Sequence, residues 1–397
     1  MAPAGRRYEI VTRFQSAQTQ ANPQGQIRYC GDDMKGKPER RASRASGNPT
    51  IGDVAAKARV APTTVSRVLN GGYVSADVRA RVEKVIKALG YVPSPTARSL
   101  KYGRKGCIGV VVESVHGAWL VGLLSGMQEE LTKRRISVLL SGLVVHGRYD
   151  SSAVQSWISE RRIDGLVFAR YTRRERDLLS AARQARIPMT FICPDETEDL
   201  GFVVRCRNFE AGRAMGQHLT ELGHRRVAFV GGPEASIDAQ DRLRGLKSVL
   251  EELGEGMRPD DVSFGASYEA EAGAQAAREY LRRPADKRPT ASVVGNDAMA
   301  IGFMRELLKA GVRIPDEHSV TGFDGVEEGA RFWPGLTTSE QPMELLGRAA
   351  VVALLDRIDD PSSDVAMTVE YPMPLALRES TGAVAVANGA KRVSRGA

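Results

Sequence analysis

The stretch APTTVSRVLNGG at residues 61–72 places two kinds of side chain on one short predicted helix. Its apolar side is formed by Val65, Val68 and Leu69. Its polar side carries hydroxyls, a guanidinium and a carboxamide, on Thr63, Thr64, Ser66, Arg67 and Asn70. Such groups bond phosphate oxygens and base edges, and an arginine binds guanine bidentately through O6 and N7. An ordinary exposed helix face has the same composition, so the neighbouring sequence must decide.

Two further helices are predicted on either side of this stretch. Apolar residues at helical spacing over 51–58 follow a start signal at Pro49 and Thr50. A break at 59–61 leads to Pro62, which suits the first position of a new helix, and Gly71-Gly72 stops that helix. Ser75 is a fair N-cap for a third helix, which has an apolar stripe from Val78 to Leu89 and ends at Gly90.

A pair of helices joined by a tight turn, with the second polar and basic outward, is a helix-turn-helix, whose second helix lies in the major groove. This arrangement predicts that Pro62, Thr63 and Arg67 contact bases. It assigns Thr64, Ser66 and Asn70 to phosphates or to helix capping. A three-helix surface domain that binds nothing fits the same periodicity.

The distribution of charge favours the DNA-binding interpretation. Residues 49–106 carry 11 Lys/Arg against 3 Asp/Glu, and residues 1–48 carry 9 against 4. The remaining residues, 107–397, carry 36 against 41. A compact basic segment joined to a mildly acidic body indicates a polyanion-binding module with a separate second function, although a solvated basic face is the simpler alternative.

Composition excludes several other classes of protein. The four cysteines form no CxxC pair, which argues against a zinc site or a disulfide framework and fits a reducing cytoplasm. No apolar run reaches the roughly 18–20 residues that span a bilayer, and residues 1–48 lack a secretory h-region. We interpret 1–48 as a disordered basic extension, within which Met34 is an alternative start. We expect no catalytic residue, metal or cofactor, because GxGxxG, GxxxxGK[ST], HExxH and GxSxG are all absent.

From Cys107 onward, short apolar runs alternate with amphipathic helices. The runs are CIGVVV (107–112), ISVLLS (136–141), DGLVFA (164–169), PMTFIC (188–193), VAFVGG (227–232), ASVVG (291–295) and SVTGF (319–323). Nearly continuous apolar strands separated by helices predict doubly wound parallel sheets buried on both faces. About 270 residues exceed what one sheet usually needs. We therefore predict two similar α/β lobes with a cleft between them.

Residues 49–378 resemble the lactose/galactose-repressor (LacI/GalR) family. The likeness lies in TIGDVAAKARVAPTTVSRVLNGGYVSADVRARVEKVIKALGYVPSPTARSLKYGRKGCIGVVV, ELGHRRVAFVGGP, DRLRGLKSVLEELG, PTASVVGNDAMAIGFMRELLKAGVRIPDEHSVTGFDG and PGLTTSEQPMELLGRAA. It implies an all-α helix-turn-helix headpiece joined to an α/β two-lobed body like type I periplasmic sugar-binding proteins. It also implies Tyr73 as a DNA contact, and a hinge helix at about 96–101 that orders on operator DNA. There Leu100 would wedge into the minor groove, flanked by Ala97, Arg98 and Lys101.

The resemblance further implies an effector site in the cleft. The stacking aromatics are Trp119 and Tyr268, and Arg242 is the hydrogen-bonding arginine. The other expected effector contacts are Tyr171, Asp297 and Asp324. Aromatic faces with charged groups suit a sugar, and would also suit a purine. For Asp297 the alternative interpretation is a helix cap.

Four departures from the family pattern stand out. Arg59 replaces the usual glycine of the helix-turn-helix turn, and Ala61 replaces the usual Ser/Thr N-cap. The sequence ESVHGAW follows the first strand in place of a common Pro-Asp-x-Ser-Asn-Pro-Phe. Arg205 and Arg207 stand where an aspartate-asparagine pair is common. The extra arginines are consistent with an acidic or phosphorylated effector.

The resulting expectation is a cytoplasmic, ligand-responsive transcriptional regulator that binds a pseudo-palindromic operator in double-stranded DNA as a homodimer, with a carbohydrate or derivative as effector and no membrane partner. The expected divisions are a headpiece at 49–92, a hinge at 93–106, a body at 107–380 and a disordered tail at 381–397. Lobe 1 is expected at about 107–206 and 324–340, and lobe 2 at about 207–323 and 341–380. The rival classes are a periplasmic solute-binding protein and a nucleotide-dependent enzyme.

Overall fold

The computed structural model describes residues 49–69, 71–91, 104–115, 117–145, 147–196, 200–361 and 367–384. They belong to two compact units, Met1–Val92 and Pro93–Ala397. Several expectations fall outside the described residues: the extension at 1–48, the hinge helix with Ala97, Arg98, Leu100 and Lys101, the phosphate or capping residue Asn70, and the end of the tail from 385 onward.

The first unit contains the three predicted helices, α1 (Ile51–Ala58), α2 (Pro62–Leu69) and α3 (Ala76–Leu89). A capping box starts α1, in which Thr50 Oγ1 accepts from the Asp53 amide at 3.3 Å and the Asp53 carboxylate accepts from the Thr50 amide at 2.8 Å. Val54, Val65 and Val82 are fully buried where the helices meet. The buried Ala55, Ala58 and Tyr91 complete this small core, to which all three helices contribute their apolar sides.

Arg59 occupies the turn between α1 and α2 with a left-handed backbone, at φ 53° and ψ 50°. The Val60 amide donates to the Ala55 carbonyl at 3.0 Å, which closes the helix end in a Schellman motif. Glycine adopts this conformation freely, whereas a side chain there costs about 1 kcal/mol. The arginine that replaces glycine at this position therefore destabilises the helix-turn-helix turn through its backbone conformation.

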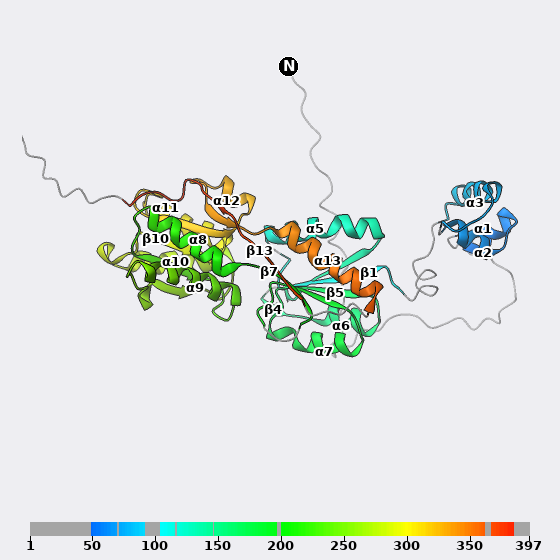
Figure 1. The fold of residues 1–397 in the computed structure, drawn as a ribbon, viewed down its shortest axis with the longest axis horizontal. Helices are drawn as coiled ribbons and strands as arrows, with labels where there is room; N and C mark the ends of the chain where they lie inside the picture. The colour runs from blue at the N-terminus through cyan, green and yellow to red at the C-terminus, as the bar shows by residue number, and fades with distance from the viewer. Residues whose placement is uncertain are drawn as a thin grey trace, which may run out of the picture. The chain divides into compact units, whose positions relative to one another are not determined.

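Lobe 1 of the second unit is a six-stranded parallel sheet in the order β13-β7-β6-β5-β1-β2 (Figure 1). Helices α5 and α13 pack together on one face, and α6 and α7 cover the other. Its elements are β1 (Cys107–Val112), α5 (Ala118–Arg134), β2 (Ser137–Gly142), a hairpin of β3 (Val144–Val145) and β4 (Arg148–Tyr149), α6 (Ser152–Ser159), β5 (Gly165–Ala169), η1 (Arg173–Glu175), α7 (Arg176–Gln184), β6 (Met189–Ile192), β7 (Phe202–Cys206), α13 (Met343–Asp359) and β13 (Met367–Tyr371).

Lobe 2 repeats this plan in a sheet ordered β14-β12-β11-β10-β8-β9, in which only the β12–β14 pair is antiparallel. Helices α8 and α9 pack as one pair and α10 and α11 as another. The elements are α8 (Asn208–Glu221), β8 (Val227–Gly231), α9 (Ile237–Glu252), η2 (Pro259–Asp261), β9 (Val262–Phe264), α10 (Ala270–Arg282), η3 (Ala285–Lys287), β10 (Ala291–Val294), α11 (Asp297–Lys309), β11 (Ser319–Asp324), α12 (Glu327–Arg331), β12 (Thr337–Glu340) and β14 (Leu375–Ala376). Two doubly wound lobes are thus present, as predicted.

The chain crosses between the lobes three times, and this corrects the expected lobe boundaries. Segment 324–340 belongs to lobe 2, because β12 pairs with β11 in parallel. Segment 343–371 belongs to lobe 1, where α13 packs on α5 and β13 pairs with β7. The crossings therefore follow β7, β12 and β13. In addition, residues 381–384 are not a free tail, since the Val384 amide donates to the Leu222 carbonyl at 3.0 Å.

Within the described segments, no helix is both long and apolar enough to cross a membrane.

Candidate functional site

Helix α2 exposes the side chains expected to read DNA. Pro62, Thr63 and Arg67 are exposed, whereas Thr64 and Ser66 are half-buried. Tyr73, just beyond the helix, is 94% exposed. Buried Val65 and Val68 hold the opposite side of α2 to the other two helices. The geometry therefore leaves the predicted base-contacting set on an accessible face.

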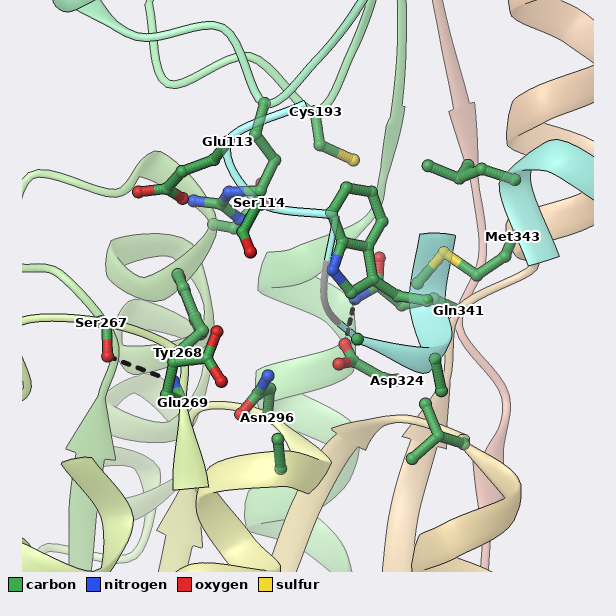
Figure 2. Close-up of a pocket in the computed structure, with 18 of the residues that line it drawn as sticks. Glu113, Ser114, Cys193, Ser267, Tyr268, Glu269, Asn296, Asp324, Gln341 and Met343 are labelled. Atoms are coloured by element: carbon green, nitrogen blue, oxygen red, sulfur yellow. Dashed lines mark hydrogen bonds and ion pairs between the residues drawn. The ribbon is translucent and has the colours of Figure 1, made fainter. Parts of the chain in front are cut away.

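A cavity of about 540 Å³ lies between the two lobes of the second unit. It is lined by residues that follow the carboxyl ends of the parallel strands, where open α/β sheets bind ligands. Four of the six expected effector residues line it: Trp119, Arg242, Tyr268 and Asp324. Figure 2 shows Tyr268, Asn296 and Asp324 around this one space, with Glu113 and Cys193 on its other side.

The two expected stacking aromatics, Trp119 and Tyr268, come from different lobes. Trp119 is the second residue of α5, whose N-cap is Gly117. Tyr268 lies just before α10, and its hydroxyl donates to Ser236 Oγ at 2.9 Å. The guanidinium of Arg170 lies over the Tyr268 ring, 4.6 Å from its centroid. The cleft therefore has one aromatic residue from each lobe, and Tyr268 is held in place.

Arg242, in the first half of α9, is only 2% exposed and is held rigidly. Its Nε donates to Asn208 Oδ1 at 2.7 Å, and its Nη1 donates to the Gly295 carbonyl. The guanidinium also stacks on Phe323, 4.4 Å from the ring centroid. Few N–H donors of this guanidinium are left for a ligand, but the contacts to the protein hold those donors in a fixed geometry.

Asp324 ends β11 with its carboxylate at the cleft and a positive φ of 124°. Its Oδ1 accepts from Gln341 Nε2, a residue of the second crossing between the lobes. Burial raises the pKa of Asp324 to about 6, against the charge of Arg242, which lowers it. The Asp324 carboxylate is therefore a charged hydrogen-bond acceptor at neutral pH, and it loses its charge on mild acidification.

Asp297 does not reach the cleft, and neither of its two expected roles holds. Its buried carboxylate accepts from the amides of Gly325 and Val326 at 2.8 and 2.9 Å, and from Thr338 Oγ1 at 2.6 Å. The N-cap of α11 is Asn296, which accepts from the Met299 amide at 2.9 Å and also lines the cleft. Asp297 instead ties the turn after β11 to β12.

Tyr171 also lies away from the cleft lining. Its ring is fully buried in lobe 1, where it packs edge-on against Phe168 and Phe191 at centroid distances of 5.8 and 5.5 Å. The preceding residue, Arg170, lines the cleft instead. A one-residue offset at the end of β5 therefore separates a core side chain from a cleft side chain.

The expected set missed a polar cluster that joins the lobes across the cleft. Arg170 Nη2 donates to Asp195 Oδ2 at 2.8 Å, and both residues belong to lobe 1. The other oxygen of Asp195 accepts from Ser236 Oγ at 3.0 Å and from the Ile237 amide at 3.1 Å, at the start of α9 in lobe 2. Both missed residues follow predicted strands, so the rule that ligands bind at strand carboxyl ends was the available signal.

The charge of the cleft does not support an acidic effector. Arg205 and Arg207 are absent from its lining, and Arg205 Nη2 donates to the Pro194 carbonyl. Two arginines do line it, together with five carboxylates, on Glu113, Asp238, Glu269, Asp324 and Glu328. An anion entering this space would meet a net negative charge. The geometry thus favours a neutral ligand with many hydroxyl donors.

Comparison with known proteins matches both units. Residues 50–94 match the bacterial regulatory proteins of the lacI family, and residues 217–381 match a periplasmic binding protein-like domain. The HTH-type transcriptional repressor PurR of Escherichia coli O139:H28 (strain E24377A / ETEC) is 33% identical over 311 residues, covering 78% of this chain and 90% of that relative.

Solved structures give the same result. A lac repressor dimer bound to operator and the anti-inducer ONPF has a TM-score of 0.72 and 27% identity, covering 85% of this chain and 100% of that chain. A complex of the transcriptional regulator CelR with cellobiose has a TM-score of 0.63 and 28% identity, covering 84% and 99%. The chain belongs to the lacI family of DNA-binding transcriptional repressors. Its relatives are repressors rather than enzymes.

Proposed function

We propose that this protein is a cytoplasmic homodimeric repressor of a pseudo-palindromic operator, and that a neutral, sugar-like molecule in the cleft controls its affinity for DNA. The observation that carries the proposal is the cleft itself. It joins an aromatic side chain from each lobe with a fixed guanidinium and several carboxylate and amide groups. Aromatic rings cover the apolar faces of sugars, and charged groups hold their hydroxyls.

The three crossings between the lobes supply the route from effector to DNA. A ligand held by both lobes favours one relative position of the lobes over another. The expected hinge, 93–106, ends with Arg104, Lys105 and Gly106, directly before strand β1 of lobe 1. A shift of lobe 1 therefore moves the points at which the two headpieces of a dimer are attached. By thermodynamic linkage, the factor by which the effector changes the affinity for the operator equals the factor by which operator binding changes the affinity for the effector.

The experiment is a titration with a ligand panel at pH 8, where Asp324 is ionised. The panel contains neutral mono- and disaccharides, including ribose and cellobiose, with uronic acids, sugar phosphates and purine bases. Binding is followed by tryptophan fluorescence, and Trp119→Phe identifies the part of the signal that comes from the cleft. We expect a neutral saccharide to bind, and Asp324→Asn to weaken it tenfold or more, because hydrogen bonds to charged groups contribute about 1.5–3 kcal/mol.

Asp316→Asn removes an exposed carboxylate of the same lobe and serves as the matched control. It should leave saccharide binding unchanged, and both variants should bind random DNA as the wild type does. Tighter binding of sugar phosphates or uronic acids than of neutral saccharides contradicts the proposed effector class. A panel in which only purines bind contradicts it as well.

A further inference from the structure

Three consecutive helices of lobe 1 end at an arginine in the left-handed conformation. Arg135, Arg161 and Arg186 follow α5, α6 and α7 with φ values of 55°, 52° and 55°. Each lies in a Schellman motif, because the next amide donates back to the last turn: Ile136 to Leu131, Arg162 to Trp157 and Ile187 to Ala182, each at 2.9 Å. Glycine is the usual residue at this position, since any side chain is strained there.

Lobe 2 provides an internal comparison. Its helices α8, α9 and α11 close with the same motif, in which His224 donates to Leu219, Glu255 to Leu250 and Val312 to Leu307. The left-handed residues there are Gly223, Gly254 and Gly311. The left-handed position after a helix is therefore occupied by glycine in lobe 2 and by arginine in lobe 1. A cation near a helix carboxyl end is favourable, but an arginine within the last turn gives that benefit without the strained backbone.

The three arginines lie along one edge of the lobe 1 sheet. They precede β2, β5 and β6, whose amino ends lie at the same edge because all strands of this sheet are parallel. Figure 1 shows α6 and α7 together on one side of this sheet. The opposite edge, at the carboxyl ends, forms the cleft. Arg162 lies beside Arg161, and we call these four exposed residues the arginine row.

The positive charge of the arginine row is not neutralised by the described part of the chain. No ion pair forms there at Arg135, Arg161, Arg162 or Arg186. Nearby carboxylates are occupied: Asp359 pairs with Arg104 and Arg134. Asp164 accepts from the backbone amides of residues 105 and 106 at 2.7–2.9 Å. The exposed Glu160 bonds Ser156 at 2.8 Å.

The chain from the headpiece enters lobe 1 at this same edge. Arg104, Lys105 and Gly106 lead directly into β1, and the Ser137 amide donates to the Gly106 carbonyl at 2.9 Å. Residues 92–103 connect this point to the headpiece and span at most about 45 Å when fully extended. The headpiece, with any DNA that it binds, is therefore tethered by this linker to the edge of lobe 1 that carries the arginine row. The helix-turn-helix turn of the headpiece also has an arginine with a left-handed backbone, Arg59.

We propose that the arginine row is a second DNA contact, which binds the phosphates that flank the sequence read by the headpiece. The inference rests on the proposed DNA-binding function and adds a surface of lobe 1 to it. Guanidinium groups match phosphate oxygens bidentately, and their fixed backbone places them in a line along the sheet edge. The contact is independent of base sequence, so it adds affinity without specificity.

The test uses the triple variant Arg135→Gly/Arg161→Gly/Arg186→Gly in the full chain. Binding to a fluorescein-labelled 60-base-pair duplex of random sequence is measured from 0.05 to 0.3 M KCl. Each lost phosphate contact lowers the slope of log affinity against log salt by about 0.9. We expect the slope to fall by about 2–3 and the affinity at 0.1 M to drop at least tenfold. The melting temperature should stay or rise, because glycine relieves the strained backbone.

Two controls separate position from net charge. The variant Arg135→Lys/Arg161→Lys/Arg186→Lys keeps the charge and should retain most of the salt slope. The variant Arg258→Gln/Arg282→Gln/Arg305→Gln, at three exposed positions of lobe 2, removes the same charge elsewhere and should change the affinity much less. A glycine variant that binds like the wild type, or like the lobe 2 variant, overturns the arginine row. A wild-type chain that fails to bind random DNA overturns the proposed DNA-binding function itself.

Discussion

Replacing Asp297 by alanine is expected to lower the free energy of unfolding of the second unit by about 3 kcal/mol or more. The substitution removes three hydrogen bonds from a fully buried carboxylate and leaves two backbone amides and the Thr338 hydroxyl without their acceptor. Each unsatisfied buried donor costs about 1–3 kcal/mol. The carboxylate occupies space that Gly322 of β11 leaves open, since a Cβ at that position would clash with Asp297 Oδ1.

Urea unfolding of the wild type and the variant measures this loss without any ligand. Asp316→Ala, at an exposed carboxylate of the same lobe, is the control and should change stability by less than about 0.5 kcal/mol. If Asp297→Ala were as stable as the control, the assignment of Asp297 to the turn after β11 would be wrong.

The pH dependence of stability follows from the same carboxylate. Burial, and next the nearby charge of Asp324, raise the pKa of Asp297 from 3.8 to about 8. The folded state therefore keeps this proton over a range in which the unfolded state releases it. The contribution to stability is largest below about pH 4, falls as the pH rises, and is lost above about pH 8. Asp297→Asn should flatten that part of the stability profile.

Replacing Arg67 by alanine is expected to weaken operator binding by about 1–3 kcal/mol, with little effect on random DNA. Arg67 is exposed on α2, whose buried side is formed by Val65 and Val68, so the substitution leaves the headpiece core intact. A bidentate contact to guanine supplies discrimination of this size. Competition binding should therefore show relaxed base preference at one position in each half-site.

Arg81→Ala, which removes an exposed arginine from α3, controls for the loss of one positive charge. Equal losses on operator and random DNA for Arg67→Ala would mean that Arg67 contacts phosphate only.

The elements with strong apolar periodicity were predictable from the sequence. The seven apolar runs all became strands, and the three headpiece helices began and ended close to the predicted residues. The strands that were missed are polar or only partly buried. β12 reads TTSE and is nonetheless almost entirely buried, because its hydroxyls find partners such as Asp297 and Met373. The wrong lobe boundaries follow from this omission, since β12 and β13 decide where the chain crosses.

The cleft was predictable only where a residue type matched a family position. Trp119 and Tyr268 line the cleft, whereas Tyr171 and Asp297 have suitable chemistry but are buried away from it. Arg170 and Asp195 were missed because their roles depend on a contact between lobes that no local pattern encodes. A one-residue change at the end of a strand moves a side chain from core to cleft, and pattern alone does not fix strand ends so closely.

Selection of bound sequences from a random DNA pool by the purified full-length protein tests the central claim most directly. A homodimer that reads DNA with α2 should enrich an inverted repeat of two related half-sites, because operator symmetry mirrors protein symmetry. The same selection with Arg67→Ala should lose information at one position in each half-site and keep the rest. Enrichment of a single unpaired half-site, or of no sequence, would contradict the account of this chain as a dimeric, operator-specific repressor.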